Sequence, residues 1–156
     1  MKLITVPYVV GLLLGVFALV FGMSANLTNL GNLKFFLDTA SFALVFVPIV
    51  GTLLIGCRGY FISSVTSIWK RDVDNQTLDR SIQFWKAAKR YAIAYGFIGT
   101  LMGLVLMLQA MGDDPGGIGP AMSIAILTVY YGLISGYLVF DPIACLLEAR
   151  KGVAEP

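Results

Sequence analysis

Few side chains in the apolar part of this chain could bind an ion or react, and for each of them a purely structural role is also possible. Thr100 and Thr128 lie inside long apolar stretches, where a hydroxyl either bonds to the carbonyl four residues earlier or stays available for function. The sequence has no His, the commonest metal ligand and the usual proton relay near neutral pH. Its two cysteines, Cys57 and Cys145, lack a CxxC spacing, which favours small apolar packing residues over a metal site or a disulfide framework.

Asp141 is the one acid that we place near a membrane span, and its depth decides its interpretation. A helix that begins at Ala121 reaches Asp141 after about 30 Å, which puts this carboxylate at the membrane boundary. Because a charge at mid-bilayer costs about 3 kcal/mol or more, we interpret Asp141 as an interfacial residue rather than an ion site. Without an acid, His or Lys at mid-membrane, the chain is not expected to be a secondary transporter. A partner must then supply any group that titrates during ion transport.

The elements that position these residues are four uncharged stretches, each long enough to cross a bilayer as a helix of about 20 residues. Apolar residues make up 58% of the chain and charged residues 13%, and no basic run suggests a nucleic-acid partner. The first apolar run, residues 3–21, exceeds the roughly 7–15 residues of a signal-peptide core, which favours a retained helix. The sequence therefore predicts an all-α membrane protein with four transmembrane helices. The uncharged stretches are 3–33, 39–57, 91–112 and 115–140.

The charges outside these stretches predict the orientation in the membrane. Of the eleven Lys and Arg residues, only Lys34 falls on the side opposite to the two termini. The positive-inside rule therefore places both termini and the loop between the second and third spans in the cytoplasm. The predicted units are the first two helices (1–57, with a periplasmic loop at 24–38), a cytoplasmic segment (58–90), the last two helices (91–148) and a cytoplasmic tail (149–156).

The cytoplasmic segment carries two apolar stripes at helical spacing. The first runs from Phe61 to Trp69, so we expect the second helix to continue past the membrane. After a polar turn, Asp74, Asn75 or Thr77 can cap another helix that runs directly into the third span. The second and third helices are thus expected to extend into a short cytoplasmic helical hairpin. The second stripe comprises Leu78, Ile82, Trp85 and Ala88. The aromatic residues expected near the membrane interface are Trp69, Trp85 and Tyr91.

Glycines recur at four-residue spacing in three of the four spans. In lipid, such small residues let helix backbones approach closely. They serve either packing within the bundle or contact between copies, and three pairs in so small a bundle favour self-association. The pairs are Gly11 with Gly15, Gly99 with Gly103, and Gly132 with Gly136.

The segment from Gly96 to Glu148 combines five motifs in order: GT-x-x-GL, a DDP turn, IGPAM, LT-x-x-YG and F-x-PIA. This combination resembles the MotA branch of the MotA/TolQ/ExbB family. The first half of the chain resembles the family more loosely, through Phe36-Leu37-Asp38, Ser41 and Val50-Gly51-Thr52 in the same order.

The resemblance implies a mechanism without an enzymatic step and without a cofactor, in the bacterial inner membrane. Family members form a homopentamer whose third and fourth helices enclose two copies of a single-span MotB/ExbD/TolR-like subunit. The partner's membrane Asp binds H⁺ or Na⁺, and ion passage drives rotation of the pentamer. On this resemblance Thr100 and Thr128 face the ion path, with hydroxyls that replace lost hydration. Pro142 matches a family proline that shapes the cytoplasmic end of the fourth helix. The glycines that let the helices close around the partner are Gly96, Gly99, Gly103, Gly132 and Gly136.

Three departures from the family pattern bear on this interpretation. Ile93 stands where members often carry a proline, and Thr128 is followed by Val129 rather than by a second Thr, which weakens a sodium assignment. The cytoplasmic segment, residues 58–90, is too short for the large domain of flagellar members.

Rotor contacts are therefore not carried over from the family. We interpret Arg71, Arg80 and Arg90 as ordinary positive-inside residues, with contact to a cytoplasmic rotor or effector as the alternative. The leading hypothesis is an ion-driven motor subunit. The alternative is a pentameric membrane scaffold or channel that keeps the fold without ion-coupled torque.

Overall fold

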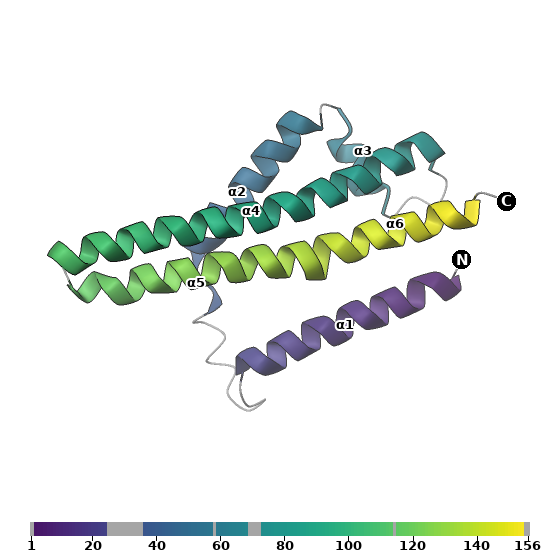
Figure 1. Cartoon of the computed structure of the whole chain (residues 1–156). Coiled ribbons are helices and arrows are strands. Elements are labelled where there is room, and N and C mark those ends of the chain that lie inside the picture. The colour runs from purple at the N-terminus through teal and green to yellow at the C-terminus, as the bar shows by residue number, and fades with distance from the viewer. Residues whose placement is uncertain (1, 25–35, 58, 69–72, 114, 155–156) are drawn as a thin grey trace.

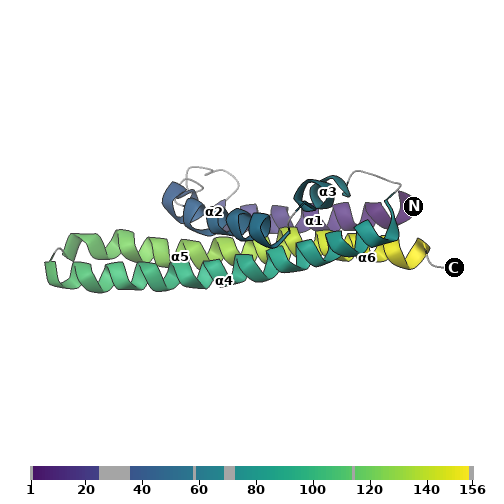
Figure 2. The same ribbon diagram turned by 90° about the horizontal axis from the view of Figure 1, so that it is seen from above.

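The computed structural model describes residues 2–24, 36–57, 59–68, 73–113 and 115–154, and within these ranges the chain is built from helices. Its centre is a long antiparallel pair, in which α4 runs beside α5 and its continuation into α6 (Figure 1). Figure 2 shows α1, α2 and α3 on one face of this pair. The start of α1 and the end of α6 lie at the same end of the molecule. The elements are α1 (Lys2–Ser24), α2 (Thr39–Gly56), α3 (Phe61–Thr66), α4 (Asn75–Asp113), the 3-10 turn η2 (Pro115–Gly117), α5 (Ile118–Ile134), the π-helical segment η3 (Ser135–Phe140) and α6 (Asp141–Ala154).

Three helical stretches within the described residues are long and apolar enough to cross a membrane: Thr39–Gly56, Asn75–Gly112 and Pro115–Lys151. A shorter apolar stretch, Val10–Gly22, lies within α1. These lengths support a multi-pass, all-helical membrane protein. The fourth span and the cytoplasmic position of both termini stay predictions.

The ends of α2 follow from local chemistry. Asp38 has extended backbone angles, and its carboxylate accepts the Ser41 N–H at 2.7 Å, which caps the helix. The helix ends at Gly56, and Gly59 then adopts a φ of 86°, a left-handed conformation that favours glycine. The prediction that the second helix continues into the cytoplasm is therefore wrong. The chain turns at Gly59, and α3 is a separate helix of 6 residues.

The prediction for the third helix is confirmed. Asp74 directly precedes α4, its carbonyl accepts the Leu78 N–H at 2.9 Å, and the helix continues for 39 residues through the apolar stretch. All four residues of the second stripe are buried in the main core. Trp85 points into that core rather than toward the membrane surface, and its Nε1–H donates to the Ser64 carbonyl at 3.3 Å. Trp69 lies outside the described residues.

Polar contacts hold α6 against α3 and α4. The Arg150 guanidinium donates to the carbonyls of Ser67 and Ile68 at 3.2 and 3.1 Å, and so fixes the end of α3. Three ion pairs join α4 to α6: Lys86 with Glu148 at 2.5 Å, Lys89 with Asp141 at 2.9 Å, and Lys151 with Asp79 at 2.8 Å. Asp141 is thus paired with Lys89, and its interfacial position stays a prediction.

The fourth predicted span is not a uniform α-helix. Residues Ser135–Phe140 form a π-helical segment, in which the Asp141 N–H donates to the Gly136 carbonyl five residues earlier. Pro142 follows directly as the second residue of α6, where it cannot donate to the carbonyl of Leu138. The widened turn thus directly precedes a residue without a backbone N–H, and Pro142 lies where the helix changes its winding.

Candidate functional site

The interface between α4 and α5 is so close that it admits only glycine at several positions. A Cβ added at Gly103 would lie 2.6 Å from the Ala125 nitrogen, and one at Gly132 would lie 2.6 Å from the Ala92 carbonyl oxygen. At Gly99 an added Cβ would lie 2.7 Å from the Cβ of Thr128. Gaps this short cannot hold a methyl group unless the backbones separate.

All five glycines predicted for the site lie on this contact between α4 and the α5–η3 helix. An added Cβ at Gly96 would meet the Gly132 Cα at 3.1 Å, and one at Gly136 would meet the Ile93 side chain at 3.3 Å. The structure therefore assigns these glycines to packing within the chain, one of the two roles left open by the sequence. Their role in closing around a partner stays a prediction.

The two predicted ion-path threonines lie together in the same interface. The Thr100 hydroxyl donates to the Gly96 and Ala125 carbonyls, both at 3.0 Å. The Thr128 hydroxyl donates to the Ile124 carbonyl at 2.9 Å and to the Ala125 carbonyl at 3.1 Å. Two hydroxyls from two helices thus converge on the carbonyl of Ala125.

This arrangement limits what the threonines can offer to an ion. Both hydroxyl protons point at carbonyl oxygens, so each hydroxyl has only lone pairs left to present. Lone pairs are what a cation needs when it sheds its hydration shell. Thr128 is fully buried and Thr100 is half-buried, so Thr100 is the more accessible of the two. The bond to the carbonyl four residues earlier, the structural alternative considered for each threonine, is present in both.

The remaining predicted residues lie away from this interface. The Arg80 guanidinium stacks over the Tyr60 ring at 4.6 Å, and Arg90 is exposed on α4. Arg71 lies outside the described residues. Among the described residues no group of His, Cys, Asp or Glu is arranged to hold a metal ion.

The sequence patterns did not predict a second polar contact, between the start of α2 and the last turn of α5. The Tyr131 hydroxyl donates to the Phe36 carbonyl and accepts the Asp38 backbone N–H at 3.1 Å. Both residues stand in motifs already singled out, Tyr131 in LT-x-x-YG and Asp38 in Phe36-Leu37-Asp38. Helical periodicity describes neighbours within one helix, so it could not predict a contact between two residues that are 93 positions apart in the chain.

Comparison with known proteins gives one family and several relatives. Residues 61–154, more than half of the chain, match the model of the MotA/TolQ/ExbB proton channel family. The chain is 57% identical to the chemotaxis protein PomA of Vibrio alginolyticus over 60 residues, which cover 38% of this chain and 23% of that protein. It is 48% identical to the uncharacterized protein YtxD of Bacillus subtilis over 66 residues, 42% of this chain and 24% of that protein. It is 53% identical to motility protein A of Cereibacter sphaeroides over 55 residues, 35% of this chain and 21% of that protein. The matched segments thus span less than a quarter of each of these relatives.

Proposed function

This chain belongs to the MotA/TolQ/ExbB proton channel family, and on that premise we propose that it is the channel-forming subunit of an ion-driven membrane motor. In this role five copies enclose the transmembrane helices of a single-span MotB/ExbD/TolR-like partner, in two copies, in the bacterial inner membrane. The flow of H⁺ or Na⁺ past a membrane Asp of the partner turns the pentamer. The similarity to a chemotaxis protein and to a motility protein supports a motor rather than a passive pore.

The observation that carries the proposal is the convergence of Thr100 and Thr128 on the Ala125 carbonyl inside an uncharged helix pair. Backbone contact at the glycines holds the two helices together, so their relative position is rigid. The polar groups between them are threonine hydroxyls and backbone carbonyls, which carry no net charge. The half-buried Thr100 offers its oxygen lone pairs at the edge of this close contact, and such oxygens suit a cation that passes along the outside of the helix pair without being trapped. A carboxylate supplied by a partner would then bind the ion.

The outer surfaces of α4 and α5 suit an assembly of this kind. From Phe97 onward α4 exposes many large apolar side chains, as does α5, and a membrane protein can bury such a surface against lipid, another copy or a partner helix. In the proposed pentamer one part of this surface meets the neighbouring copies and another part meets the partner. Representative exposed residues are Phe97, Leu101, Val105, Leu108, Met122 and Ile126.

The proposal is tested by co-expression with a single-span protein that has an Asp in its span, encoded by a neighbouring reading frame. We expect the two proteins to purify together and to pass cations when reconstituted in liposomes. The double variant Thr100→Ala/Thr128→Ala should lower the cation flux at least tenfold while the complex stays assembled. Thr66→Ala is a matched control, because its hydroxyl also bonds to a carbonyl within its own helix but lies on α3.

The alternative is a pentameric scaffold or channel without ion-coupled torque. Co-purification with unchanged flux in the double variant would contradict the ion-path role of the threonines and favour this alternative. A monomer or dimer in mass measurements on the purified chain would contradict the pentamer itself.

A further inference from the structure

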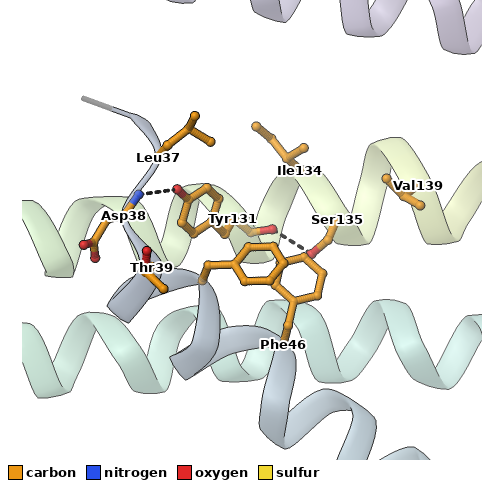
Figure 3. A pocket seen from close by; sticks show the side chains of 9 residues that line it. Leu37, Asp38, Thr39, Phe46, Tyr131, Ile134, Ser135 and Val139 are labelled. Carbon is orange, nitrogen blue, oxygen red and sulfur yellow. Dashed lines mark hydrogen bonds between the residues drawn. The ribbon is translucent and has the colours of Figure 1, made fainter. Parts of the chain in front are cut away.

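The exposed face of α4 around Arg90 offers a ligand something that the cavity of this chain does not, namely an unbalanced charge. The cavity, about 360 Å³ between the start of α2 and the α5–η3 helix, is lined mostly by apolar side chains (Figure 3). The Asp38 carboxylate points away from it, so the cavity does not distinguish one apolar occupant from another. A charge does select its occupant, because it favours the opposite charge.

Arg90 stands out among the cations of α4 and α6, whose side chains are all described. The three ion pairs between these helices neutralise each of their lysines with an acid. The Arg150 guanidinium is held by two carbonyls of α3, and the Arg80 guanidinium stacks over the Tyr60 ring. Arg90 has no acid, carbonyl or ring as a partner among the described residues, and it is exposed. Its charge is therefore free to bind an anion.

The length of the apolar run in α4 fixes the depth of Arg90. Residues 91–112 carry no charge and extend about 33 Å as a helix, against a hydrocarbon core about 30 Å thick. Arg90 at one end and Asp113 at the other confine the core to this run, since a charge inside it is costly. Arg90 thus lies in the headgroup layer, which adds about 5–8 Å on each side of the core.

The side of α4 that carries Arg90 continues as an exposed apolar face. Arg90 is followed at helical spacing by Ala94, Phe97 and Leu101, and all four residues are exposed. Ala92, which is fully buried, lies on the opposite side of the helix. A cation with an apolar strip directly beyond it has the same layout as a phospholipid, whose phosphate lies next to its acyl chains.

A second copy of the chain does not supply the missing anion from its described residues. Copies in one membrane assembly share their depth, so a neighbour would need a free acid at the level of Arg90. Three acids are already in ion pairs, and the Asp38 carboxylate accepts two bonds from Ser41. Asp74 is exposed, but it precedes Arg90 by sixteen residues, about 24 Å along the helix. Anionic lipids, in contrast, lie at the right depth and attract cations next to a span.

We propose that this face of α4 binds an anionic phospholipid, with the lipid phosphate on the Arg90 guanidinium and an acyl chain along Ala94 and Phe97. A guanidinium can donate two parallel N–H bonds to phosphate oxygens, which makes Arg better suited than Lys to this contact. The lipid occupies only the end of the α4 surface next to Arg90 and leaves the rest to other copies and to the partner. The proposal does not rest on the proposed function, because it needs only α4 and the membrane around it.

The test is native mass spectrometry of the full chain in mild detergent, with phosphatidylglycerol or phosphatidylcholine of the same acyl chains added. One cation near the membrane surface favours anionic lipid about fivefold, so we expect about this preference for phosphatidylglycerol and its loss in Arg90→Gln. Arg80→Gln is the matched control, because it makes the same change on the same helix. Arg80 lies about 15 Å before Arg90, beyond the headgroup layer, so this variant should keep the preference.

The apolar half of the site is tested from its other end. Phe97→Ala should lower the binding of both lipids, whereas Leu108→Ala should not, because Leu108 lies about 27 Å along the helix from Arg90, in the other leaflet. Equal binding of phosphatidylglycerol to the wild type and to Arg90→Gln would overturn the proposal, as would an equal loss of preference in Arg80→Gln.

Two other occupants of this face give different results. Displacement of bound phosphatidylglycerol by excess inorganic phosphate would show that the phosphate alone is recognised and would overturn the assignment to a lipid. If Arg90→Gln kept its lipid and lost a co-purified single-span protein, the face would belong to that protein, and the proposal would also be wrong. Retained lipid preference without any such protein would support the lipid site and count against the proposed function alone.

Discussion

The two halves of α4 are held by opposite kinds of packing. From Asn75 to Ala92 the helix buries large apolar side chains and carries the three lysine or aspartate partners of its ion pairs with α6. From Gly96 onward it meets α5 through glycines and two threonines, without a charged residue as far as Gly112. One continuous helix therefore passes from a core of the kind found in water-soluble proteins to a contact of the kind found in membranes.

The difference has a physical reason. In water, burial of large apolar side chains stabilises a fold because it removes their surface from solvent. In lipid that gain is absent, so helices associate through close backbone contact and hydrogen bonds. The change of packing near residue 92 agrees with the predicted membrane boundary of α4. Substitutions in the two halves should therefore affect stability in different ways.

The largest effect is expected for Leu147→Ala in the core of the first half. Leu147 is fully buried on α6, and the loss of a buried leucine costs about 2–5 kcal/mol. Thermal unfolding in mild detergent, followed by circular dichroism, measures the loss. Ile62→Ala is the matched control, since Ile62 is 76% exposed on α3 and its truncation should leave the midpoint nearly unchanged.

The next largest effect is expected for Gly103→Ala in the second half. The added methyl group would lie 2.6 Å from the Ala125 nitrogen, so the helices must separate, at a cost of about 1–3 kcal/mol. Gly51→Ala is the control, because an added Cβ at Gly51 meets nothing within 4 Å. The same unfolding assay compares the two, and equal midpoints would show that backbone contact does not hold α4 to α5.

A smaller effect is expected for Trp85→Phe. The change removes the indole N–H that donates to the Ser64 carbonyl and leaves a small void in the core, which together cost about 1–2 kcal/mol. If Trp85 were instead an interfacial anchor, its fluorescence would be quenched by brominated lipids. We expect little quenching, because the side chain is buried among α3, α4 and α6 residues.

The smallest effect is expected for Asp141→Asn, which breaks the ion pair with Lys89. Both side chains are partly exposed, and such pairs contribute at most about 1 kcal/mol. The difference from wild type should shrink further in high salt, since salt screens exposed charges. The loss in Gly103→Ala should not depend on salt, and a salt-dependent loss there would contradict the division between the halves.

Sequence patterns predicted much of this helix and less of its neighbours. The apolar stripe from Leu78 to Ala88, the run of α4 into the third span and the spacing of the glycines all follow from periodicity. The break at Gly59 was missed because the apolar stripe resumes in helical register at Phe61, and a stripe does not reveal a left-handed residue before it. The pairing of α4 with α6 by charge was missed because ion pairs depend on how helices meet.

Residue types and their spacing specify where the helices are apolar, where glycines allow close contact, and that few charges enter the predicted spans. Those properties are local, since they depend on residue type and spacing along one helix. The packing of the helices decides instead that Thr100 and Thr128 share the Ala125 carbonyl, and that the Asp38 N–H reaches the Tyr131 hydroxyl. Such contacts depend on the angles and depths at which helices cross. These are set by the fit of side chains between helices, which no single helix encodes.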